Sequence, residues 1–521
     1  ANMNPFYYTR SIGPIYPVWE RDAMGNKVID PATGEPALDW GTPAQMGARP
    51  FAGGFNLIGM LNLNERSLRR FNGNSNSYIE INFLKDFYFK TTLGVNYTDG
   101  YRTVFQNSEF GDAVGVGGRS VKTSLRQSSL TLNEVLSWNK EFGNHSLRAL
   151  AGHENYRFQF DQLSGTRTGF PFPGTTELNT AATIEDASSY QDNHRIESYF
   201  TGINYSFGQK YLASASFRRD GTSRFHADTR WGNFYSVGAG WRISQEPFMQ
   251  HINWLNELKL KISYGEQGNE DILFDDGTSN YYAYQNLYLL GDWNNVGNPG
   301  AMPGGLPNPA LQWESNKVFN VGADFTMFDN RLQGTIEFFN RESDNLLFDV
   351  PLPTSTGNES ITRNIGTMKN TGIEMSLGYN AIRKRDFDWR VDLNLTHFRN
   401  KITRLPQDEI IKGTKKLMVG KSIYEYWLVE YAGVDAATGD ALFYKDVLDA
   451  NGKPTGERVV TNNSTQASFY YHGTAVPDLT GGLTNSLRYK EFELSFLLTF
   501  STGGRSCDNN YQTLMHCGEN G

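Results

Sequence analysis

The chain has 521 residues, a net charge of −8, an aromatic fraction of 14% and 53 glycines. Its mean hydropathy is −0.52, and it has no run of about 18 uncharged apolar residues, so the sequence excludes a transmembrane helix. It does not exclude a membrane β-barrel, because only every second residue of a spanning strand has to be apolar. The acidic balance argues against a nucleic-acid partner, since such proteins usually carry a basic surface.

The first strong pattern predicts a β-hairpin between residues 78 and 97. Ile79, Ile81 and Phe83 alternate with polar residues, which places them on one face of a strand. The same alternation resumes after Lys85-Asp86 in FYFKTTLGVNYT. We therefore predict two antiparallel strands joined by a two-residue turn.

Further hairpins of the same kind follow along the chain. Their predicted turns lie at residues 142–144, 208–209, 329–330, 383–386 and 490–491. Extending this count predicts about fourteen to sixteen strands, with uncertain boundaries. Many run to ten residues or more, which is the length a tilted strand needs to cross a membrane.

Long polar segments connect the hairpins at their other ends. They cover residues 101–124, 161–193, 271–311, 346–366, 403–422 and 446–474. Short turns at one end and long loops at the other are typical of an outer-membrane barrel. The alternatives are soluble all-β folds. A propeller or solenoid would show a fixed repeat, and a sandwich would have shorter strands with a polar outer face, so the membrane barrel is favoured.

Motifs for catalysis are missing from the sequence. GAGWRI at 238–243 begins like a dinucleotide-binding loop, but Ile243 stands where the last glycine is needed. We find no GxSxG, GxxxxGK[ST] or HExxH pattern. We therefore expect no enzymatic activity, no cofactor and no metal site.

Acidic loops offer a weak alternative, because their oxygen atoms could hold Ca²⁺. In NEDILFDDG the carboxylates belong to Glu270, Asp271, Asp275 and Asp276, but their spacing is not that of an EF-hand, so a solvated loop is favoured. The acidic segments at 22–36, 435–440 and 449–457 are better explained as Asp-Gly turns.

Aromatic residues of the long loops are the candidate binding residues. They are Tyr281, Tyr282, Tyr284 and Trp293. Rings beside polar groups can stack on sugars or hold peptides, so we assign them to substrate or lid contact. The alternative is packing of the loop against its neighbours. The sequence also leaves open whether Cys507 and Cys517 form a disulfide.

The stretch FRRDGTSRFHADTRWGNFYSVGAGWRIS, residues 217–244, combines charge with alternation. We expect its charged part, from Arg218 to Arg230, to cross the outer rim of the barrel, where its arginines are solvated or paired. Trp231, Tyr235 and Val237 begin the lipid-facing side of the next strand. The arginines are interpreted as architecture rather than as an active site.

This stretch closely resembles the SusC/RagA family of TonB-dependent outer-membrane transporters. The resemblance continues over most of the chain through LKLKISYGEQGN (258–269), NPALQWESNKVFNVGADF (308–325), NRLQGTIEFFNRESDNLLF (330–348), NIGTMKNTGIEMSL (364–377), YAGVDAATGDALFY (431–444) and VPDLTGGLTNSLRYKEFELSFLLTFSTGG (476–504). It implies a plugged barrel of about 22 strands in the bacterial outer membrane. Residues 1–521 would form a barrel portion, and we expect a longer protein, since no plug, TonB box or closing strand is recognised.

The resemblance implies active import of glycans or oligopeptides. The implied partners are a SusD-like surface lipoprotein acting as lid, TonB with ExbB/ExbD acting through the plug, outer-membrane lipid, and a second transporter–lid pair. Polar residues on the inward face would meet the plug or a wet lumen: Lys90, Asn96, Asp324, Glu337, Arg390 and Asp392. The alternative function is a passive porin, because nothing in the alternation separates the two.

Overall fold

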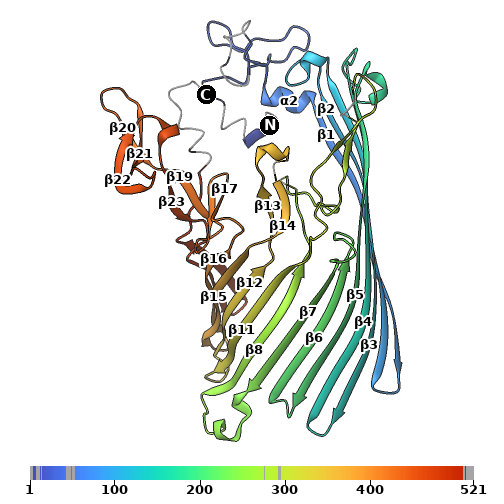
Figure 1. The fold of residues 1–521 in the computed structure, drawn as a ribbon, viewed down its shortest axis with the longest axis vertical. Coiled ribbons are helices and arrows are strands. Elements are labelled where there is room, and N and C mark those ends of the chain that lie inside the picture. The colour runs from blue at the N-terminus through green and yellow to red at the C-terminus, as the bar shows by residue number, and fades with distance from the viewer. Residues whose placement is uncertain are drawn as a thin grey trace.

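The structure is a computed structural model that describes residues 4–6, 12, 15–42, 49, 53–274, 276–291, 295–358, 360–508 and 511. Its main element is one antiparallel sheet of 14 strands (Figure 1). In sheet order these are β1 (Glu65–Phe83), β2 (Phe87–Gln106), β3 (Arg119–Phe142), β4 (His145–Thr168), β5 (Thr183–Phe207), β6 (Tyr211–Thr222), β7 (Trp231–Arg242), β8 (Leu255–Asn269), β11 (Glu314–Met327), β12 (Leu332–Asp344), β15 (Thr367–Arg383), β16 (Phe387–Arg404), β24 (Leu479–Tyr489) and β25 (Phe492–Thr502). This up-and-down meander confirms the predicted all-β antiparallel fold.

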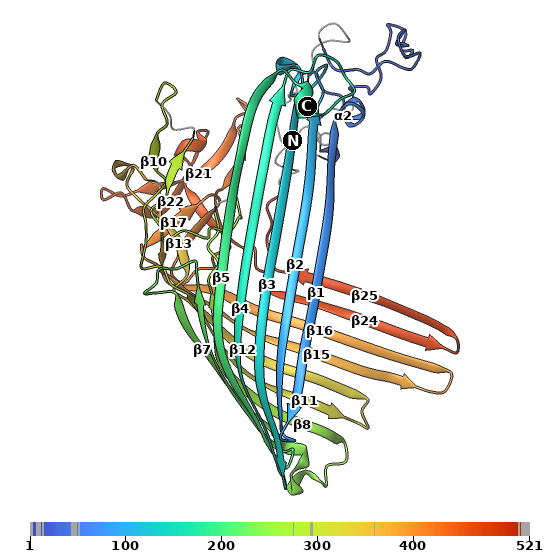
Figure 2. The same ribbon diagram turned by 90° about the vertical axis from the view of Figure 1, so that its right-hand side faces the viewer.

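The sheet is strongly coiled, and its two edge strands are β1 and β25. Figure 2 shows β24 and β25 running across the direction of the tall strands β1–β5. Each strand has a right-handed twist, and the rotation between neighbours accumulates over many strands until the sheet curls. The curvature is that of a barrel wall.

Alternation gives the sheet one apolar and one polar face. Along β16, Trp389, Val391 and Leu393 lie on one face, while Arg390 and Asp392 lie on the other. The apolar face is open, with exposed fractions of 44% for Ile203, 52% for Val237, 48% for Ile262 and 49% for Ile373. A contiguous exposed apolar surface of this kind is what a membrane barrel turns toward lipid, so the polar face lines the lumen.

Short turns join the strands at one end of the sheet. The turn predicted at residues 490–491 is confirmed by the last pair, Tyr489 with Phe492. The turn predicted at residues 142–144 is one residue shorter, because Phe142 still pairs with His145. The two-residue turn predicted at Lys85-Asp86 is wrong. The last pair is Phe83 with Phe87, so the turn also includes Leu84. Leu84 and Lys85 adopt φ values of +48° and +64°, a left-handed conformation that residue type alone does not predict for leucine.

The long loops lie at the other end of the sheet. The connections predicted at 271–311 and 346–366 are confirmed, between β8 and β11 and between β12 and β15, but the first two predicted loops are much shorter than expected. Residues 101–106 and 119–124 belong to β2 and β3, and much of 161–193 belongs to β4 and β5. These strands continue past the length that a bilayer requires, with 24 residues in β4 and 25 in β5. The prediction failed because these strand segments are mostly polar and their few apolar residues do not alternate.

Segments 403–422 and 446–474, predicted as separate loops, belong to one excursion between β16 and β24. We call residues 405–478 the distal excursion. It contains β17 (Glu409–Lys412), β18 (Lys415–Met418), β19 (Glu425–Val429), β20 (Tyr431–Val434), β21 (Ala441–Leu448), β22 (Pro454–Thr461), η6 (Ser464–Gln466) and β23 (Phe469–Thr474). These strands form a four-stranded sheet and a three-stranded sheet beyond the barrel wall (Figure 1).

The remaining elements lie mostly at this loop end. They are α2 (Leu57–Leu63), η1 (Val114–Val116), η2 (Leu178–Thr180), β9 (Tyr288–Leu290), β10 (Ala301–Pro303), β13 (Leu347–Pro351), η5 (Thr354–Thr356) and β14 (Ser360–Asn364), with η3 (Ile243–Gln245) and η4 (Pro247–Met249) at the turn end. Within the described part of the chain, no helix has the length and apolarity to cross a membrane.

A carboxylate ties two of the short turns together. Glu246, which follows η3, is 7% exposed. It accepts hydrogen bonds from the Tyr211 hydroxyl at 2.6 Å and from Trp241 Nε1 at 3.2 Å. The Tyr211 hydrogen bond and then the Trp241 hydrogen bond lower the pKa of Glu246, because both favour the charged form.

Replacing Glu246 by glutamine is expected to destabilise the barrel in a pH-dependent way. Because the folded-state pKa lies below the ordinary value of 4.5, the ionised group stabilises the fold fully above that pH. This stabilisation is lost as pH falls through the lowered pKa. The difference in melting temperature between wild type and Glu246→Gln should thus be largest at neutral pH and shrink in acid. Glu491→Gln, in the exposed β24–β25 turn, is the control, and a difference independent of pH would contradict the assignment.

Candidate functional site

Charged side chains of the polar face form ion pairs between neighbouring strands. Lys261 of β8 places its Nζ atom 3.1 Å from Asp324 of β11 and 3.0 Å from Glu337 of β12. Each side chain is 26–35% exposed, so these charges are half-buried. Asp324 and Glu337 therefore lie on the polar face, as the alternation predicted.

The other residues predicted to point inward also lie on the polar face. Arg390 contacts Asp392 at 2.6 Å. Asn96 donates a hydrogen bond to the Ser129 hydroxyl at 3.3 Å. Lys90 Nζ lies 4.2 Å from the centre of the Tyr78 ring. These contacts give the lumen a wall of paired charges and amides, while contact with a plug stays a prediction.

The charged stretch 218–230 is divided differently from the prediction. Arg218 and Asp220 belong to β6, which continues to Thr222, so the connecting loop covers only 223–230. Arg218 is paired on the lumen side with Glu154 at 2.8 Å and with Asp220 at 2.7 Å. The rim loop is thus shorter than expected, because paired charges are accommodated in a strand that faces a polar lumen.

A buried polar cluster lies where this loop meets the first residues after β8. We call Tyr156, His194, Arg224, Glu270 and Tyr281 the rim cluster. The side chains of His194, Arg224 and Glu270 are only 7%, 5% and 14% exposed. His194 Nε2 lies 3.0 Å from Glu270, and the Arg224 guanidinium lies 4.6 Å from the centre of the Tyr281 ring. Edge contact of Tyr156 with His194, at 5.9 Å between ring centres, completes the cluster.

The rim cluster retains unused hydrogen-bonding capacity. Arg224 Nε and Nη1 and Glu270 Oε2 are buried and make no hydrogen bond to the part of the chain that the structure describes. Arg224 Nη2 contacts Asp271 at 3.0 Å. This cluster could not be predicted from the sequence, because its members come from distant segments. The one available signal was the apolar Phe225 set among charges, which indicates a loop that folds inward.

The predicted binding tyrosines pack within the protein and are half-buried. Tyr281 lies 5.5 Å from His194 between ring centres, and the Tyr282 hydroxyl accepts a hydrogen bond from the Asn193 amide at 2.9 Å. Tyr284 packs against a core cluster of Phe225, Ile272 and Leu311, which are at most 4% exposed. Trp293 lies outside the described residues. The rings therefore fasten the loop to the wall, and their contact with substrate or lid stays a prediction.

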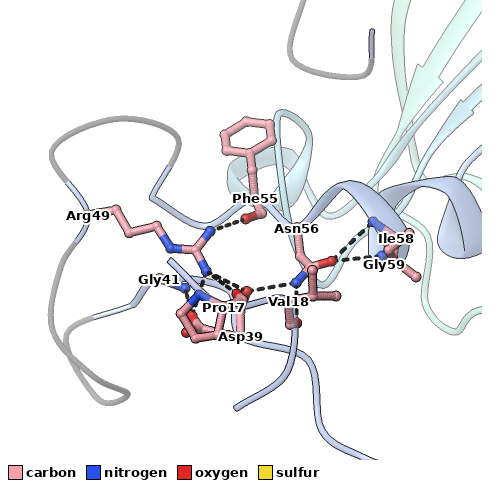
Figure 3. Close-up of polar contacts among 9 residues, drawn as sticks. All are labelled: Pro17, Val18, Asp39, Gly41, Arg49, Phe55, Asn56, Ile58 and Gly59. Carbon is pink, nitrogen blue, oxygen red and sulfur yellow. Dashed lines mark hydrogen bonds and ion pairs between the residues drawn. The ribbon is translucent and has the colours of Figure 1, made fainter. Parts of the chain in front are cut away.

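A second polar cluster anchors the segment that precedes β1 (Figure 3). Arg49 contacts the Asp39 carboxylate at 2.7 Å, with side chains only 2% and 3% exposed. Asn56 donates to the carbonyl oxygens of Val18 and Asp39, both at 2.8 Å. Its own side-chain oxygen accepts from the Gly59 amide at the start of α2. We call Asp39, Arg49 and Asn56 the anchor triad, because it ties residues 15–42 to the helix that leads into β1.

The acidic segments at 22–36, 435–440 and 449–457 have the turn geometry that the sequence indicated. Asp22, Asp435 and Asp449 each accept backbone amides two residues further on, at 2.8–2.9 Å. Asp276 does the same with Thr278, while Asp275 lies outside the described residues. The solvated loop favoured for NEDILFDDG is wrong for Glu270, whose side chain is only 14% exposed because it pairs with His194 in the rim cluster. No group of metal-binding side chains occurs among the residues with described positions. Cys507 is exposed, whereas Cys517 lies outside the described residues, so their pairing stays open.

Comparison with known proteins places this architecture in a family. Residues 24–513 match the family described as TonB dependent receptor-like, beta-barrel. TonB-dependent receptor SusC of Bacteroides thetaiotaomicron is 29% identical over 451 residues, which cover 85% of this chain and 43% of that protein. TonB-dependent receptor P3 of Formosa agariphila is 29% identical over 477 residues, which cover 85% of this chain and 45% of that protein.

Among solved structures, the RagAB peptide importer in its closed-closed state matches with a TM-score of 0.78 and 25% identity. The match covers 90% of this chain and 51% of that one. The chain thus spans about half the length of the relatives it matches. These matches confirm the predicted resemblance and the outer-membrane location. The chain belongs to the TonB-dependent receptor-like β-barrel family.

Proposed function

We propose that the whole protein imports nutrients actively across the outer membrane. The observation that carries the proposal is the family match over residues 24–513. The polar face supports it, because paired charges such as Lys261 with Asp324 and Glu337 suit a wet lumen. The relatives are named as receptors and as a peptide importer, and we infer that this protein likewise breaks no covalent bond.

The parts that make such a barrel work are supplied outside these 521 residues. An open strand edge cannot stay in lipid, since its backbone groups would be unsatisfied. We infer that further strands pair with β1 and β25, the edges of the sheet, and that a plug domain fills the lumen. TonB with ExbB/ExbD would pull on this plug, and a SusD-like lipoprotein would close the extracellular mouth. The transporter–lid pair would assemble with a second copy.

The substrate class we propose is a glycan or an oligopeptide. The extracellular mouth offers rings beside polar groups, which suits both ligands. At the rim cluster, Arg224 Nε and Nη1 make no hydrogen bond among the described residues, and such donors favour a ligand with carbonyl or carboxylate oxygens. Native mass spectrometry of the purified full-length complex would identify the ligand that co-purifies.

Energy dependence separates this proposal from a passive porin. Cells that carry the full gene should take up the ligand, and dissipating the proton gradient should stop accumulation, because TonB draws its energy from the inner membrane. A strain that lacks the gene gives the background. Uptake that continues unchanged without the gradient would establish the porin alternative instead.

Removing the Tyr281 ring is expected to weaken ligand binding about two- to tenfold, since one aromatic contact contributes about 0.5–1.5 kcal/mol. Tyr281→Ala would be compared with Tyr288→Ala, which removes a 57% exposed tyrosine from the same connection. The measurement is a titration of the co-purified ligand into the full-length protein. Equal affinities for the two variants would show that Tyr281 only fastens the loop.

A further inference from the structure

The lipid-facing side of β15 and β16 changes abruptly from apolar to basic. Along β16 the outward residues Trp389, Val391, Leu393 and Leu395 are followed by His397, Arg399 and Lys401. On β15, Ile373, Thr371 and Lys369 lie on this same face, and Lys369 is the one nearest the loop end of the sheet. Three permanent cations, Lys369, Arg399 and Lys401, thus gather on the outer wall. We call them the basic patch.

The basic patch lies at the height where the hydrocarbon core of the membrane ends on its extracellular side. From Phe387, at the turn end of β16, to His397 is ten steps along the strand. At about 3.3 Å per residue this is about 33 Å of strand, or about 25 Å of height at a tilt of about 40°. Since the apolar band of such barrels is about 25 Å tall, the basic patch begins where the headgroups of the outer leaflet lie.

The register of the strands forces like charges together. Lys369 is directly opposite Lys401, and Thr371 is opposite Arg399. Like charges opposite each other on one face of a sheet destabilise it. Glu342 neutralises Lys369 at 3.1 Å, but no ion pair to Arg399 or Lys401 is found among the residues that the structure describes. The patch therefore carries an uncompensated charge of about two, which an anion would relieve.

A groove joins this charge to the apolar surface. It has a volume of about 370 Å³, and its lining includes Phe338 and Ile373 together with Lys369, Arg399 and Lys401. Phe338 and Ile373, 38% and 49% exposed, form its apolar part below the cations. A molecule that fits must combine an anionic head with an acyl chain.

We propose that this groove binds a phosphorylated glycolipid of the outer leaflet. Its phosphate lies between Arg399 and Lys401, with Lys369 as third donor, and an acyl chain runs down over Phe338 and Ile373. Phosphate suits the site, because guanidinium and ammonium groups are its usual donors. The bound lipid relieves the repulsion between Arg399 and Lys401, which lie on the same face of β16, and so stabilises the upper part of the β15–β16 hairpin.

Binding of diphosphoryl lipid A to the full-length protein in detergent, followed by native mass spectrometry, tests the proposal. The double variant R399Q/K401Q should bind about tenfold or more weakly, since each interfacial cation contributes severalfold to affinity for an anionic lipid. The matched control is K384Q/R385Q, which removes the same charge from the exposed turn at the other end of the hairpin. This control should bind as wild type does.

Two further measurements distinguish binding of the phosphorylated lipid from binding of other anions. Dephosphorylated lipid A should bind wild type as weakly as diphosphoryl lipid A binds R399Q/K401Q, and millimolar inorganic phosphate should not displace the lipid, because it lacks the acyl chain. Equal binding by R399Q/K401Q and K384Q/R385Q would overturn the proposal, as would displacement by phosphate alone. Heat-modifiable migration on gels establishes that both variants are folded barrels.

Discussion

Asp39→Ala is expected to release the segment 15–42 from α2. Breaking a buried ion pair costs about 3–5 kcal/mol, because a charge stays behind in a poorly solvated place. Asp39 and Arg49 meet this condition, with side chains only 3% and 2% exposed. Asp39 also accepts a hydrogen bond from the Gly41 amide at 2.7 Å, which the variant loses. Hydrogen exchange of residues 15–42 should then accelerate by two orders of magnitude or more.

The control for this result is Asp30→Ala. Asp30 accepts a hydrogen bond from the Ala32 amide at 2.9 Å in an exposed turn of the same segment, so its loss is expected to cost about 1 kcal/mol or less. The sheet itself should keep its exchange protection in both variants. If residues 15–42 exchanged hydrogen equally slowly in Asp39→Ala and in Asp30→Ala, the anchor triad would not be what holds the segment in place.

Val237→Arg is expected to impair assembly of the barrel in the membrane. Val237 is 52% exposed on the apolar face of β7, between the aromatic residues Tyr235 and Trp241 of the same face. An arginine that faces lipid near the midplane costs about 2–4 kcal/mol, because its charge leaves water. The folded fraction after refolding into vesicles, read from heat-modifiable migration, should therefore fall markedly.

Ser214→Arg is the matched variant for this test. Val237 pairs with Ala215 across the sheet, and Ser214, the next residue, points to the opposite, polar face. An arginine there enters the wet lumen, so assembly should be close to that of wild type. If Val237→Arg assembled normally and Ser214→Arg did not, the assignment of the two faces would be inverted.

Period-two alternation determined most of the barrel wall. The outward set Trp389, Val391 and Leu393 and the inward pair Arg390 and Asp392 follow from the sequence of β16 alone, because a strand admits only two directions for a side chain. The hairpin turn at residues 490–491 followed in the same way, from a break in the pattern, and the turn predicted at 142–144 was right to within one residue. The turn at residues 84–86 was misjudged, because nothing in a leucine indicates a positive φ.

The extracellular end could not be predicted to the same degree. Its segments are polar and irregular, so no periodicity marks where β4 and β5 stop or that 405–478 is one excursion with two small sheets. The candidate tyrosines were found by composition, but their partners His194 and Asn193 were not. These partners lie far from the tyrosines in sequence, and only the folded loops bring them together, so a local pattern could not predict the contacts.

By itself, the sequence determined a two-faced antiparallel sheet, the end at which its turns are short, and the family to which the chain belongs. These depend on local pattern and on motifs that neighbouring residues carry together. Only the tertiary structure decided that Asp39 meets Arg49, that Arg224 lies between Glu270 and Tyr281, and that Lys369 faces Lys401. Such pairings depend on strand register and loop closure, which no short stretch of sequence encodes.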